Sequence, residues 1–425
     1  MANISVPSGK RYLLQDGKPY FYLADTIWMA FQKLSLEEWQ NYLRLRRRQG
    51  FNAVQISVLP IAHDNSVGEE DIEPFALDEE GHYLFDQINE AYFDKAEIMV
   101  EMAAEAGITP CLHLFWVNYI PDTWGALKSP ERVLPLSRVR ELAKYMLNRF
   151  DRYHPIYSVT GDTNFETPRV VEYYQAIFDV LEELAPDGVT SMHLMGGLDH
   201  VPEELLHRSG YSFYSYQSSH GGKEFLSNIT KCSEGFLRQP LVKPLINTEP
   251  CYEGLGNFEN PYEKFSSFDV RRALWSSVLS GASAGITYGA HGAWGCHKKG
   301  MLFLAKSMWG EPYDFQDAIR LDGANDAGFV RHIMESHQLM GLLPAQELTD
   351  TPYIMAGTLE NQDVLVVYQP FDCEFTLYKE LSDYRVTAWN LAARRTFIPE
   401  LTMGDGRTLV GINGSNHDAL YIFEK

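Results

Sequence analysis

The chain has few cysteines and none of the motifs in which cysteine pairs act. Its 425 residues include five cysteines at wide spacing, with no CxxC motif among them: Cys111, Cys232, Cys251, Cys296 and Cys373. The odd number and the spacing argue against a disulfide framework and against a zinc ribbon. The N-terminal residues also lack the apolar segment of a signal peptide. Both absences favour a reducing compartment, and we expect a cytoplasmic protein.

Long apolar runs and positive charges are scarce as well. No segment approaches the roughly 18 consecutive apolar residues that a membrane-spanning helix needs. Lys and Arg number 36 against 57 Asp and Glu, which gives a formal net charge of -21. A surface this acidic repels nucleic acids and anionic membranes, so we expect neither as a partner. With 45% hydrophobic and 22% charged residues, the composition is that of a folded globular protein and not of a disordered chain.

Nucleotide-binding, metal-binding and serine-hydrolase motifs are absent too. The sequence has no P-loop, no dinucleotide-binding fingerprint, no Gly-x-Ser-x-Gly elbow and no HExxH pair. His113 has no second histidine at metal-ligand spacing, which favours a hydrogen bond to substrate or to a catalytic carboxylate. His291, Cys296 and His297 share a glycine-rich loop, which is a weak metal signal. We therefore expect neither a metal ion nor an organic cofactor.

The first 350 residues alternate between short apolar runs and longer segments of helical period. This alternation is typical of βαβ units, and eight repeats of it predict a (β/α)8 TIM barrel. The expected strands cover 20–24, 53–59, 109–115, 156–160, 190–195, 213–217, 244–247 and 285–288. The expected helices cover 36–49, 93–106, 136–152, 168–184, 203–207, 223–232, 268–279 and 325–340.

After Pro344 the pattern changes to short strands separated by turn signals. The expected strands cover 353–357, 364–369, 374–378, 385–390, 396–398, 407–411 and 419–423. Short strands at such regular spacing predict a small antiparallel β-sandwich. We therefore expect two domains, a catalytic barrel over residues 1–348 and a C-terminal β-sandwich over residues 349–425.

Polar and aromatic residues follow the expected strands. Since the active site of a barrel lies at the C-terminal ends of its strands, these residues are the site candidates. They are Asp25, Trp28, His63, Asp64, His113, Trp116, Asp162, His200, Tyr216, Gln217, His220, Glu249, Tyr252, Tyr288, His291 and Trp294. Core packing would explain a single aromatic residue here. Aromatic rings together with carboxylates and imidazoles favour a sugar ligand, whose apolar faces stack on rings and whose hydroxyls need polar partners.

Two of these carboxyl groups have the placement that glycoside hydrolysis requires. Asp162 follows the fourth strand after one glycine, and the next expected helix begins too far away for Asp162 to cap it. Glu249 ends the apolar seventh strand, where a carboxylate without partners would be costly. We expect Asp162 and Glu249 to be catalytic. Asp25, the third carboxylate, is expected to hold a sugar hydroxyl or a neighbouring arginine.

Several stretches resemble the DUF4038 barrel hydrolases, which are related to the apiosidases of glycoside hydrolase family 140. They are 22–28 (YLADTIW), 50–55 (GFNAVQ), 160–162 (TGD), 216–220 (YQSSH), 247–253 (NTEPCYE) and 284–290 (AGITYGA) with Trp294. The resemblance implies a (β/α)8 barrel, a following β-sandwich and a glycosidase, with Asp162 as acid/base and Glu249 as nucleophile. Thr160 and Ser219 stand where the family usually has glycine, so the resemblance does not identify the sugar as apiose.

Together these observations predict a retaining glycoside hydrolase acting on a plant-type oligosaccharide or glycoside. The expected sugar-binding residues are Asp25, Trp28, His113, Trp116, Tyr216, Gln217, His220, Tyr252, Tyr288 and Trp294. Two alternatives stay open: an inverting or cellulase-like endo-acting enzyme on the same barrel, and a carbohydrate-binding barrel without catalysis.

Overall fold

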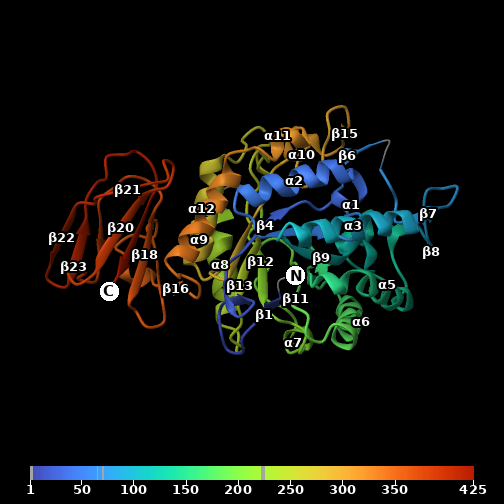
Figure 1. The fold of residues 1–425 in the computed structure, drawn as a ribbon, viewed down its shortest axis with the longest axis horizontal. Coiled ribbons are helices and arrows are strands. Elements are labelled where there is room, and N and C mark those ends of the chain that lie inside the picture. Colours follow the sequence, from blue (N-terminus) through green and yellow to red (C-terminus); the bar gives the residue numbers. More distant parts are fainter. Residues whose placement is uncertain (1–2, 65, 69–70, 222–224) are drawn as a thin grey trace.

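Eight parallel strands form the centre of the larger unit of the protein (Figure 1). The computed structural model describes residues 3–64, 66–68, 71–221 and 225–425. The barrel strands are β4 (Tyr22–Thr26), β5 (Ala53–Ser57), β9 (Thr109–Trp116), β10 (Ile156–Gly161), β11 (Thr190–Ser191), β12 (Tyr214–Gln217), β13 (Leu245–Glu249) and β14 (Gly285–Tyr288). Their neighbours follow chain order, and a parallel bridge between Thr190 and Tyr211 joins β11 to the segment before β12. The predicted (β/α)8 barrel is confirmed.

Helices surround this barrel in the order that the sequence predicts. They are α2 (Leu36–Arg48), α3 (Glu90–Glu105), α5 (Leu136–Phe150), α6 (Pro168–Leu184), α7 (Glu203–Leu206), α8 (Phe225–Leu237), α9 (Ser267–Leu279) and α12 (Gly323–Ser336). Helix α2 begins where a capping box forms: Ser35 Oγ accepts from Glu38 N, and the Glu38 carboxylate accepts from Ser35 N. Residues 223–224, the start of one expected helix, lie outside the described residues.

Smaller elements cover the two ends of the barrel. The hairpin sheet of β1 (Ile4–Ser5), β2 (Leu13–Gln15) and β3 (Lys18–Tyr20) packs Leu13 and Tyr20 against apolar residues at the strands' N-terminal ends. At the other end lie α1 (Ala30–Lys33), α4 (Trp124–Lys128), α10 (Lys306–Trp309) and α11 (Phe315–Ala318). There β6 (Ser66–Val67) pairs with β15 (Leu302–Phe303), beside α10 and α11 in Figure 1, and β7 (Phe75–Leu77) pairs with β8 (Tyr83–Ile88).

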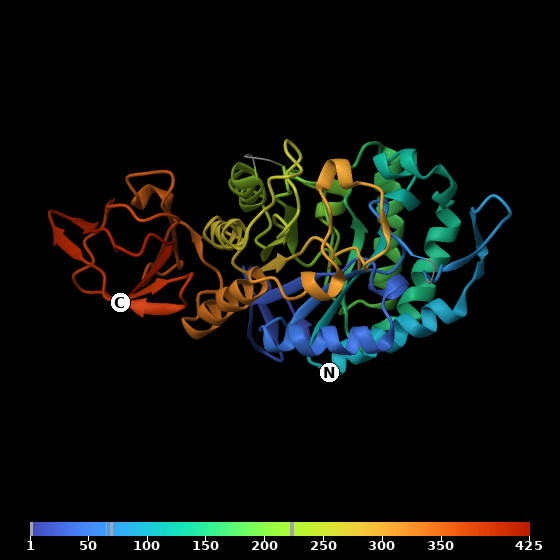
Figure 2. The ribbon, with the colours of Figure 1, turned by 90° about the horizontal axis from the view of Figure 1, so that it is seen from above.

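The C-terminal unit contains two antiparallel sheets and lies at one end of the long axis (Figures 1 and 2). One holds β16 (Leu343–Pro344), β17 (Met355–Thr358), β18 (Val364–Gln369), β20 (Arg385–Asn390), β21 (Arg395–Phe397) and β24 (Ala419–Glu424). The other holds β19 (Phe375–Leu377), β22 (Leu401–Gly404) and β23 (Arg407–Val410). Side chains of both sheets share one apolar core that includes Leu365, Phe375, Val410 and Tyr421.

Two details of this unit differ from the sequence prediction. Strand β22 was not expected, because Leu401–Gly404 is mostly exposed and so lacks the alternation of a half-buried strand. Strand β16 lies within the predicted barrel range of 1–348, yet it pairs with β17. By its sheet pairing, the C-terminal unit therefore begins before residue 348.

A buried cluster of ion pairs joins the two units. Arg271 of α9 donates from Nε and Nη2 to the two carboxylate oxygens of Asp418, at 2.8 and 2.7 Å. Its Nη1 donates to Asp326 Oδ2 of α12 at 2.9 Å, and Arg394 of the C-terminal unit donates to Asp326 Oδ1 at 2.7 Å. Because Arg271, Asp326 and Asp418 are all buried, the pairing holds the C-terminal unit against α9 and α12.

We expect Arg271→Met to lower the free energy of unfolding by about 3–5 kcal/mol, because it leaves the buried Asp418 without its arginine and leaves Asp326 with Arg394 alone. Urea unfolding measures the change. The matched control is Arg385→Met, which removes an arginine that is 78% exposed and pairs with Glu424. An exposed pair contributes at most about 1 kcal/mol. Equal effects of the two substitutions would contradict the structural role of Arg271.

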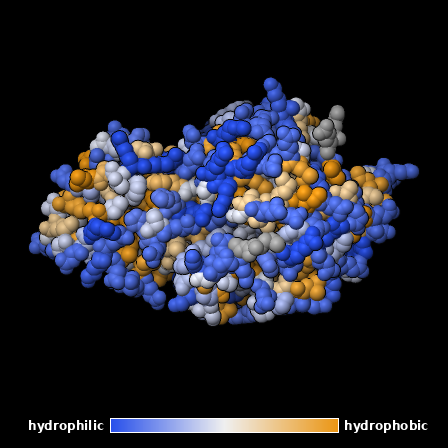
Figure 3. All heavy atoms as spheres, viewed as in Figure 1, coloured by the Kyte–Doolittle hydropathy of each residue, from blue (hydrophilic) through white to orange (hydrophobic). Residues whose placement is uncertain are grey.

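The outer surface agrees with the composition. The face in Figure 3 is mostly hydrophilic, with apolar residues scattered over it. In the part of the chain that the structure describes, no helix is both long and apolar enough to cross a membrane.

Candidate active site

A cavity of about 380 Å³ opens beyond the C-terminal ends of the barrel strands. Its size lies in the range of small-molecule sites. Eight of the twelve predicted site residues line it: Trp28, Trp116, Asp162, Gln217, His220, Glu249, Tyr252 and Trp294. The remaining lining residues are Ile61, His63, Trp124, Lys128, Met195, Gly196, Ser219, Leu255, Phe258 and Trp309. Among the described residues, the cavity lining therefore combines seven Trp, Tyr and Phe side chains with seven polar or charged ones, a mixture that suits the apolar faces and the hydroxyls of a sugar.

Two histidines hold the carboxylate of Glu249, the last residue of β13. His220 Nε2 lies 2.7 Å from Glu249 Oε1, and His193 Nε2 lies 3.2 Å from Oε2. The backbone N–H of Tyr252 donates to His220 Nδ1 at 3.3 Å. Since Nδ1 accepts, the N–H on Nε2 is the group that donates a hydrogen bond to Glu249. Thr248 Oγ1, 3.2 Å from His193 Nδ1, orients the second ring.

These contacts keep Glu249 ionised. Burial by itself would raise the pKa of this carboxyl, but the hydrogen bonds and charges of His193 and His220 outweigh burial and hold the pKa well below its ordinary value. Glu249 is only 6% exposed. It is therefore a fixed, buried carboxylate that faces a cavity, which is the state a nucleophile needs.

Asp162 lies just past the end of β10 in a left-handed backbone conformation, with φ of 64°. Aspartate tolerates this conformation better than most residues. Trp124 Nε1 donates to the Asp162 carbonyl oxygen at 3.0 Å and fixes the turn. The preceding Gly161 has no room for a side chain, because a Cβ there would lie 2.0 Å from the Trp116 ring. The glycine thus lets Trp116 pack against the strand end that presents Asp162.

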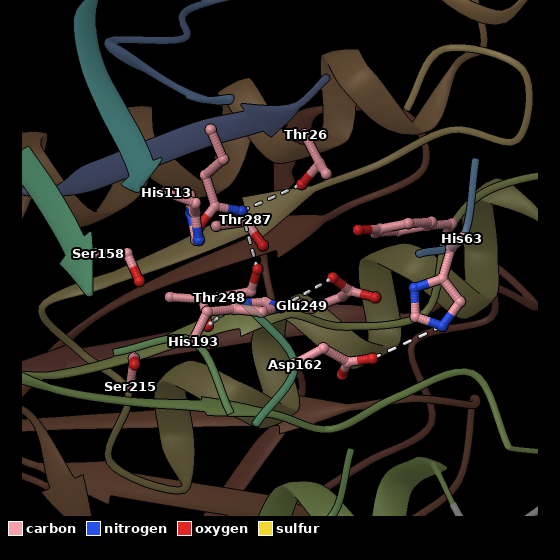
Figure 4. A network of polar contacts seen from close by, with 12 residues as sticks. Thr26, His63, His113, Ser158, Asp162, His193, Ser215, Thr248, Glu249 and Thr287 are labelled. Atoms are coloured by element: carbon pink, nitrogen blue, oxygen red, sulfur yellow. Dashed lines mark hydrogen bonds and ion pairs between the residues drawn. The ribbon is translucent and has the colours of Figure 1, made fainter. Parts of the chain in front are cut away.

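The carboxyl group of Asp162 is in the opposite state to that of Glu249. Burial, and then the negative charge of Glu249, raise its pKa well above the ordinary value, and Lys128 offsets only part of this rise. Figure 4 shows both carboxyl groups directed into the same space. Two neighbouring carboxyl groups with pKa values pushed apart are the pattern that assigns one as acid and the other as nucleophile or base.

Aromatic rings form the walls of the cavity. The Trp28 ring lies 5.0 Å from Trp116 and 5.3 Å from His193, both at edge-on angles. Trp294 and Trp309 lie 5.7 Å apart, also edge-on. The indole nitrogens of Trp116, Trp294 and Trp309 have no hydrogen-bond partner within the described residues. The walls can therefore offer ring surfaces to a sugar.

Asp25 does not line the cavity, and the prediction that it binds a sugar hydroxyl is corrected. The side chain is fully buried. Its Oδ2 accepts from Arg46 Nε at 2.6 Å and from Tyr42 OH at 2.7 Å, both on α2. The alternative expectation, a neighbouring arginine, is the one that the structure shows. These two hydrogen bonds of Asp25 connect β4 to α2.

Three further predicted sugar-binding residues are also buried outside the cavity. His113 lies behind Trp28, with ring centroids 4.7 Å apart, and its Nδ1 is 3.4 Å from the Thr160 carbonyl oxygen. Tyr216 accepts from Ser233 Oγ at 3.0 Å, and Tyr288 donates to the Glu253 carboxylate at 2.6 Å. These polar atoms have protein partners, so His113, Tyr216 and Tyr288 support the site from behind.

The sequence interpretation missed several residues of the site. His193 lies behind the cavity lining and was counted as an interior residue of the fifth strand, yet it contacts Glu249. His63 was noted only as one of the residues after a strand. Trp124 and Lys128 come from α4, and Trp309 from α10, two short helices inside loops. The aromatic residues of these loops could have indicated a ligand site, but their spacing does not show that the loops fold back over the barrel.

Asp162→Asn is expected to stabilise the protein at neutral pH. An aspartate in the unfolded chain has a pKa of about 3.9, whereas the pKa of Asp162 in the folded protein is raised. Above about pH 4 the folded protein therefore binds a proton at Asp162 that the unfolded chain has released. The wild type therefore loses stability as pH rises from about 4 toward the folded pKa, by up to about 1.4 kcal/mol per pH unit. Asparagine does not titrate. The free energy of unfolding of the variant, measured with urea, should therefore exceed that of the wild type by an amount that increases with pH at the same rate.

The matched control for this experiment is Asp187→Asn, which changes an exposed aspartate of the loop after α6. A surface change of this kind alters stability by less than about 0.5 kcal/mol. An advantage of Asp162→Asn that stays constant with pH would contradict a protonated Asp162.

The comparisons with known proteins agree with this fold. The model of the apiosidase-like catalytic domain matches residues 7–341. A solved glycoside hydrolase aligns with a TM-score of 0.78 at 18% identity, over 100% of this chain and 97% of its own. A glycoside hydrolase family 5 protein from Bacteroides vulgatus ATCC 8482 aligns with a TM-score of 0.76 at 19% identity, over 99% and 93%. A family 5 mannosidase from Rhizomucor miehei aligns with 0.52 at 11% identity, over 80% and 100%. No curated protein sequence matches.

A (β/α)8 barrel that presents two carboxyl groups in one aromatic cavity has the fold and the site of a glycoside hydrolase. The family match covers the whole barrel and ends at residue 341, just before β16. The chain belongs to the apiosidase-like family, and the predicted enzyme class is confirmed.

Proposed function

We propose that the protein is a retaining glycoside hydrolase in which Asp162 is the acid/base and Glu249 the nucleophile. The observation that carries the proposal is a pair of carboxyl groups that face one cavity, with the pKa of Asp162 raised and the pKa of Glu249 lowered. An inverting enzyme would also need an acid and a base. The two histidines that hold both oxygens of Glu249 favour a group that is fixed in position for attack on carbon.

The reaction would proceed in two steps. In the first, the Asp162 O–H bond breaks and its proton bonds to the glycosidic oxygen, while Glu249 forms a bond to the anomeric carbon and the alcohol leaves. In the second, the Asp162 carboxylate takes a proton from water, whose oxygen attacks the anomeric carbon and releases Glu249. The second step returns both groups to their starting states.

The substrate would be a plant-type oligosaccharide or glycoside. The family name supports this class through its apiosidase-like members. The ring faces of Trp28, Trp116 and Trp294 would stack on the sugar, and Gln217 and Tyr252 would bind its hydroxyls.

A panel of nitrophenyl glycosides that includes apiosides, other pentosides and hexosides tests the function. For each sugar that is hydrolysed, proton NMR gives the anomeric configuration of the first product. Retention supports the proposal, whereas inversion assigns the alternative mechanism. Sugar binding by calorimetry with no hydrolysis of any glycoside would instead show a binding protein and overturn the proposal.

A further inference from the structure

His63 reaches the cavity from the loop after β5 and lies beside Asp162. Its Nε2 is 3.6 Å from Asp162 Oδ2, a contact drawn as a dashed line in Figure 4. The Trp124 and Trp309 rings lie 4.8 and 5.7 Å from the imidazole ring. Aromatic packing therefore limits how far this imidazole can turn away from the carboxyl group. The two-step reaction above gives His63 no part.

The contact between His63 and Asp162 is not a salt bridge in the free protein. Burial, and then the charge of Lys128, lower the pKa of His63 to about 4, so the ring is neutral near neutral pH. Asp162 has a raised pKa, which favours its protonated form. Among the described residues, the charged and titratable groups that shift these two pKa values are Lys128, Glu166, Glu249, His193 and His220.

The contact changes character when Asp162 gives up its proton. The O–H bond breaks, the proton bonds to the glycosidic oxygen, and a carboxylate is left in a buried site. A buried carboxylate is costly unless a donor faces it. His63 Nε2 is placed to be that donor, and catalytic hydrogen bonds that are long in the free enzyme often shorten in the substrate complex.

We propose that His63 is a positioning residue whose Nε2–H donates a hydrogen bond to the Asp162 carboxylate formed during proton transfer. His63 thereby sets the strength of the general acid. This inference rests on the proposed function, in which Asp162 is the acid/base.

Two substitutions separate this role from simple packing. His63→Leu fills similar space without a donor, and His63→Gln keeps an N–H donor at similar reach. We expect His63→Leu to lower kcat/KM by about 10-fold or more for a phenyl glycoside, which needs the acid, and by at most about 2-fold for the dinitrophenyl glycoside, which does not. His63→Gln should recover most of the loss. A residue that only packs would lower both substrates equally.

A titration of the free protein tests the contact without any substrate. Removing a donor to the carboxylate disfavours the ionised form, so the pKa of Asp162 should rise in His63→Leu and stay near the wild-type value in His63→Gln. NMR of labelled aspartate carboxyl carbons, assigned with Asp162→Asn, measures it. The basic limb of kcat/KM for the phenyl glycoside should move to higher pH in the same variant.

Equal losses of His63→Leu for both substrates, or an unshifted Asp162 titration, would overturn the role of His63. Asp162→Ala, assayed with the same two glycosides, keeps this failure apart from a failure of the proposed function. If Asp162→Ala itself shows no dependence on the leaving group, the acid/base assignment is wrong. In that case the role of His63 in catalysis is overturned as well.

Discussion

Glu249→Ala is expected to lower kcat by about 10⁴-fold or more. The substitution removes the carboxylate that would bond to the anomeric carbon, and the neighbouring His193 and His220 are held by Thr248 and by the Tyr252 backbone. Among the described residues that line the cavity, Asp162 is the other carboxyl group, and its raised pKa favours the protonated form, which cannot substitute for a carboxylate nucleophile. Steady-state assays with an activated nitrophenyl glycoside measure the loss.

Adding azide distinguishes the loss of a nucleophile from other causes of low activity. The alanine leaves space for a small anion, so azide should restore turnover and give a glycosyl azide of inverted configuration. Glu249→Gln is the matched control, because it removes the charge but fills the space, and azide should not rescue it. Normal activity of Glu249→Ala, or a glycosyl azide of retained configuration, would contradict the assignment.

Asp162→Ala is expected to cost about 10²–10⁴-fold in kcat/KM for a phenyl glycoside and only a few-fold for the dinitrophenyl glycoside. A poor leaving group needs the proton of Asp162 to depart, whereas dinitrophenolate leaves without it. The second step still lacks its base, so glycosyl-enzyme should accumulate with the activated substrate. A burst of dinitrophenol in stopped-flow measurements would report that accumulation.

Azide distinguishes this variant from the nucleophile variant. In Asp162→Ala it should attack the accumulated intermediate and give a glycosyl azide of retained configuration, which is the opposite of the Glu249→Ala product. Asp162→Asn is the control for space, and it should be rescued much less. Losses of equal size with both glycosides would show that Asp162 supports the structure and is not the acid.

The strands and both carboxyl groups were predictable because two simple regularities apply to them. Apolar runs of strand length between helical segments indicate a barrel, and the residue at a strand's C-terminal end faces the site. Asp162 and Glu249 satisfy both. The same reasoning failed for Asp25, since a strand end does not show whether a carboxylate meets the cavity or the next helix. Here the arginine of α2 decides it.

The sequence did not show which residues at the strand ends point into the cavity and which point toward the surrounding helices. Tyr216 and Gln217 are adjacent at the end of β12, so their side chains point in opposite directions. Gln217 lines the cavity, whereas the Tyr216 hydroxyl meets Ser233 of α8. Strand alternation predicts that one of the two is turned away, but which one depends on the tilt and register of the closed barrel.

The residues contributed by loops were unpredictable for a different reason. Trp309 of α10 belongs to a segment that folds over the barrel, where the Gly256 N–H donates to the Trp309 carbonyl oxygen at 3.0 Å. Such contacts join distant parts of the chain and follow no periodic pattern. His193 was missed because only the last residues of each expected strand were considered, and β11 ends at Ser191.

Trapping of the covalent intermediate tests the central claim most directly. The reagent is a fluorosugar with a good leaving group and fluorine beside the anomeric carbon, built on the sugar that the glycoside panel identifies. Fluorine slows both steps, and the good leaving group restores the first, so the intermediate should persist. The account predicts one added fluorosugar in the intact mass and a labelled peptide that carries the sugar on Glu249. A label on Asp162 or another residue, or an active enzyme that forms no adduct and inverts configuration, would contradict it.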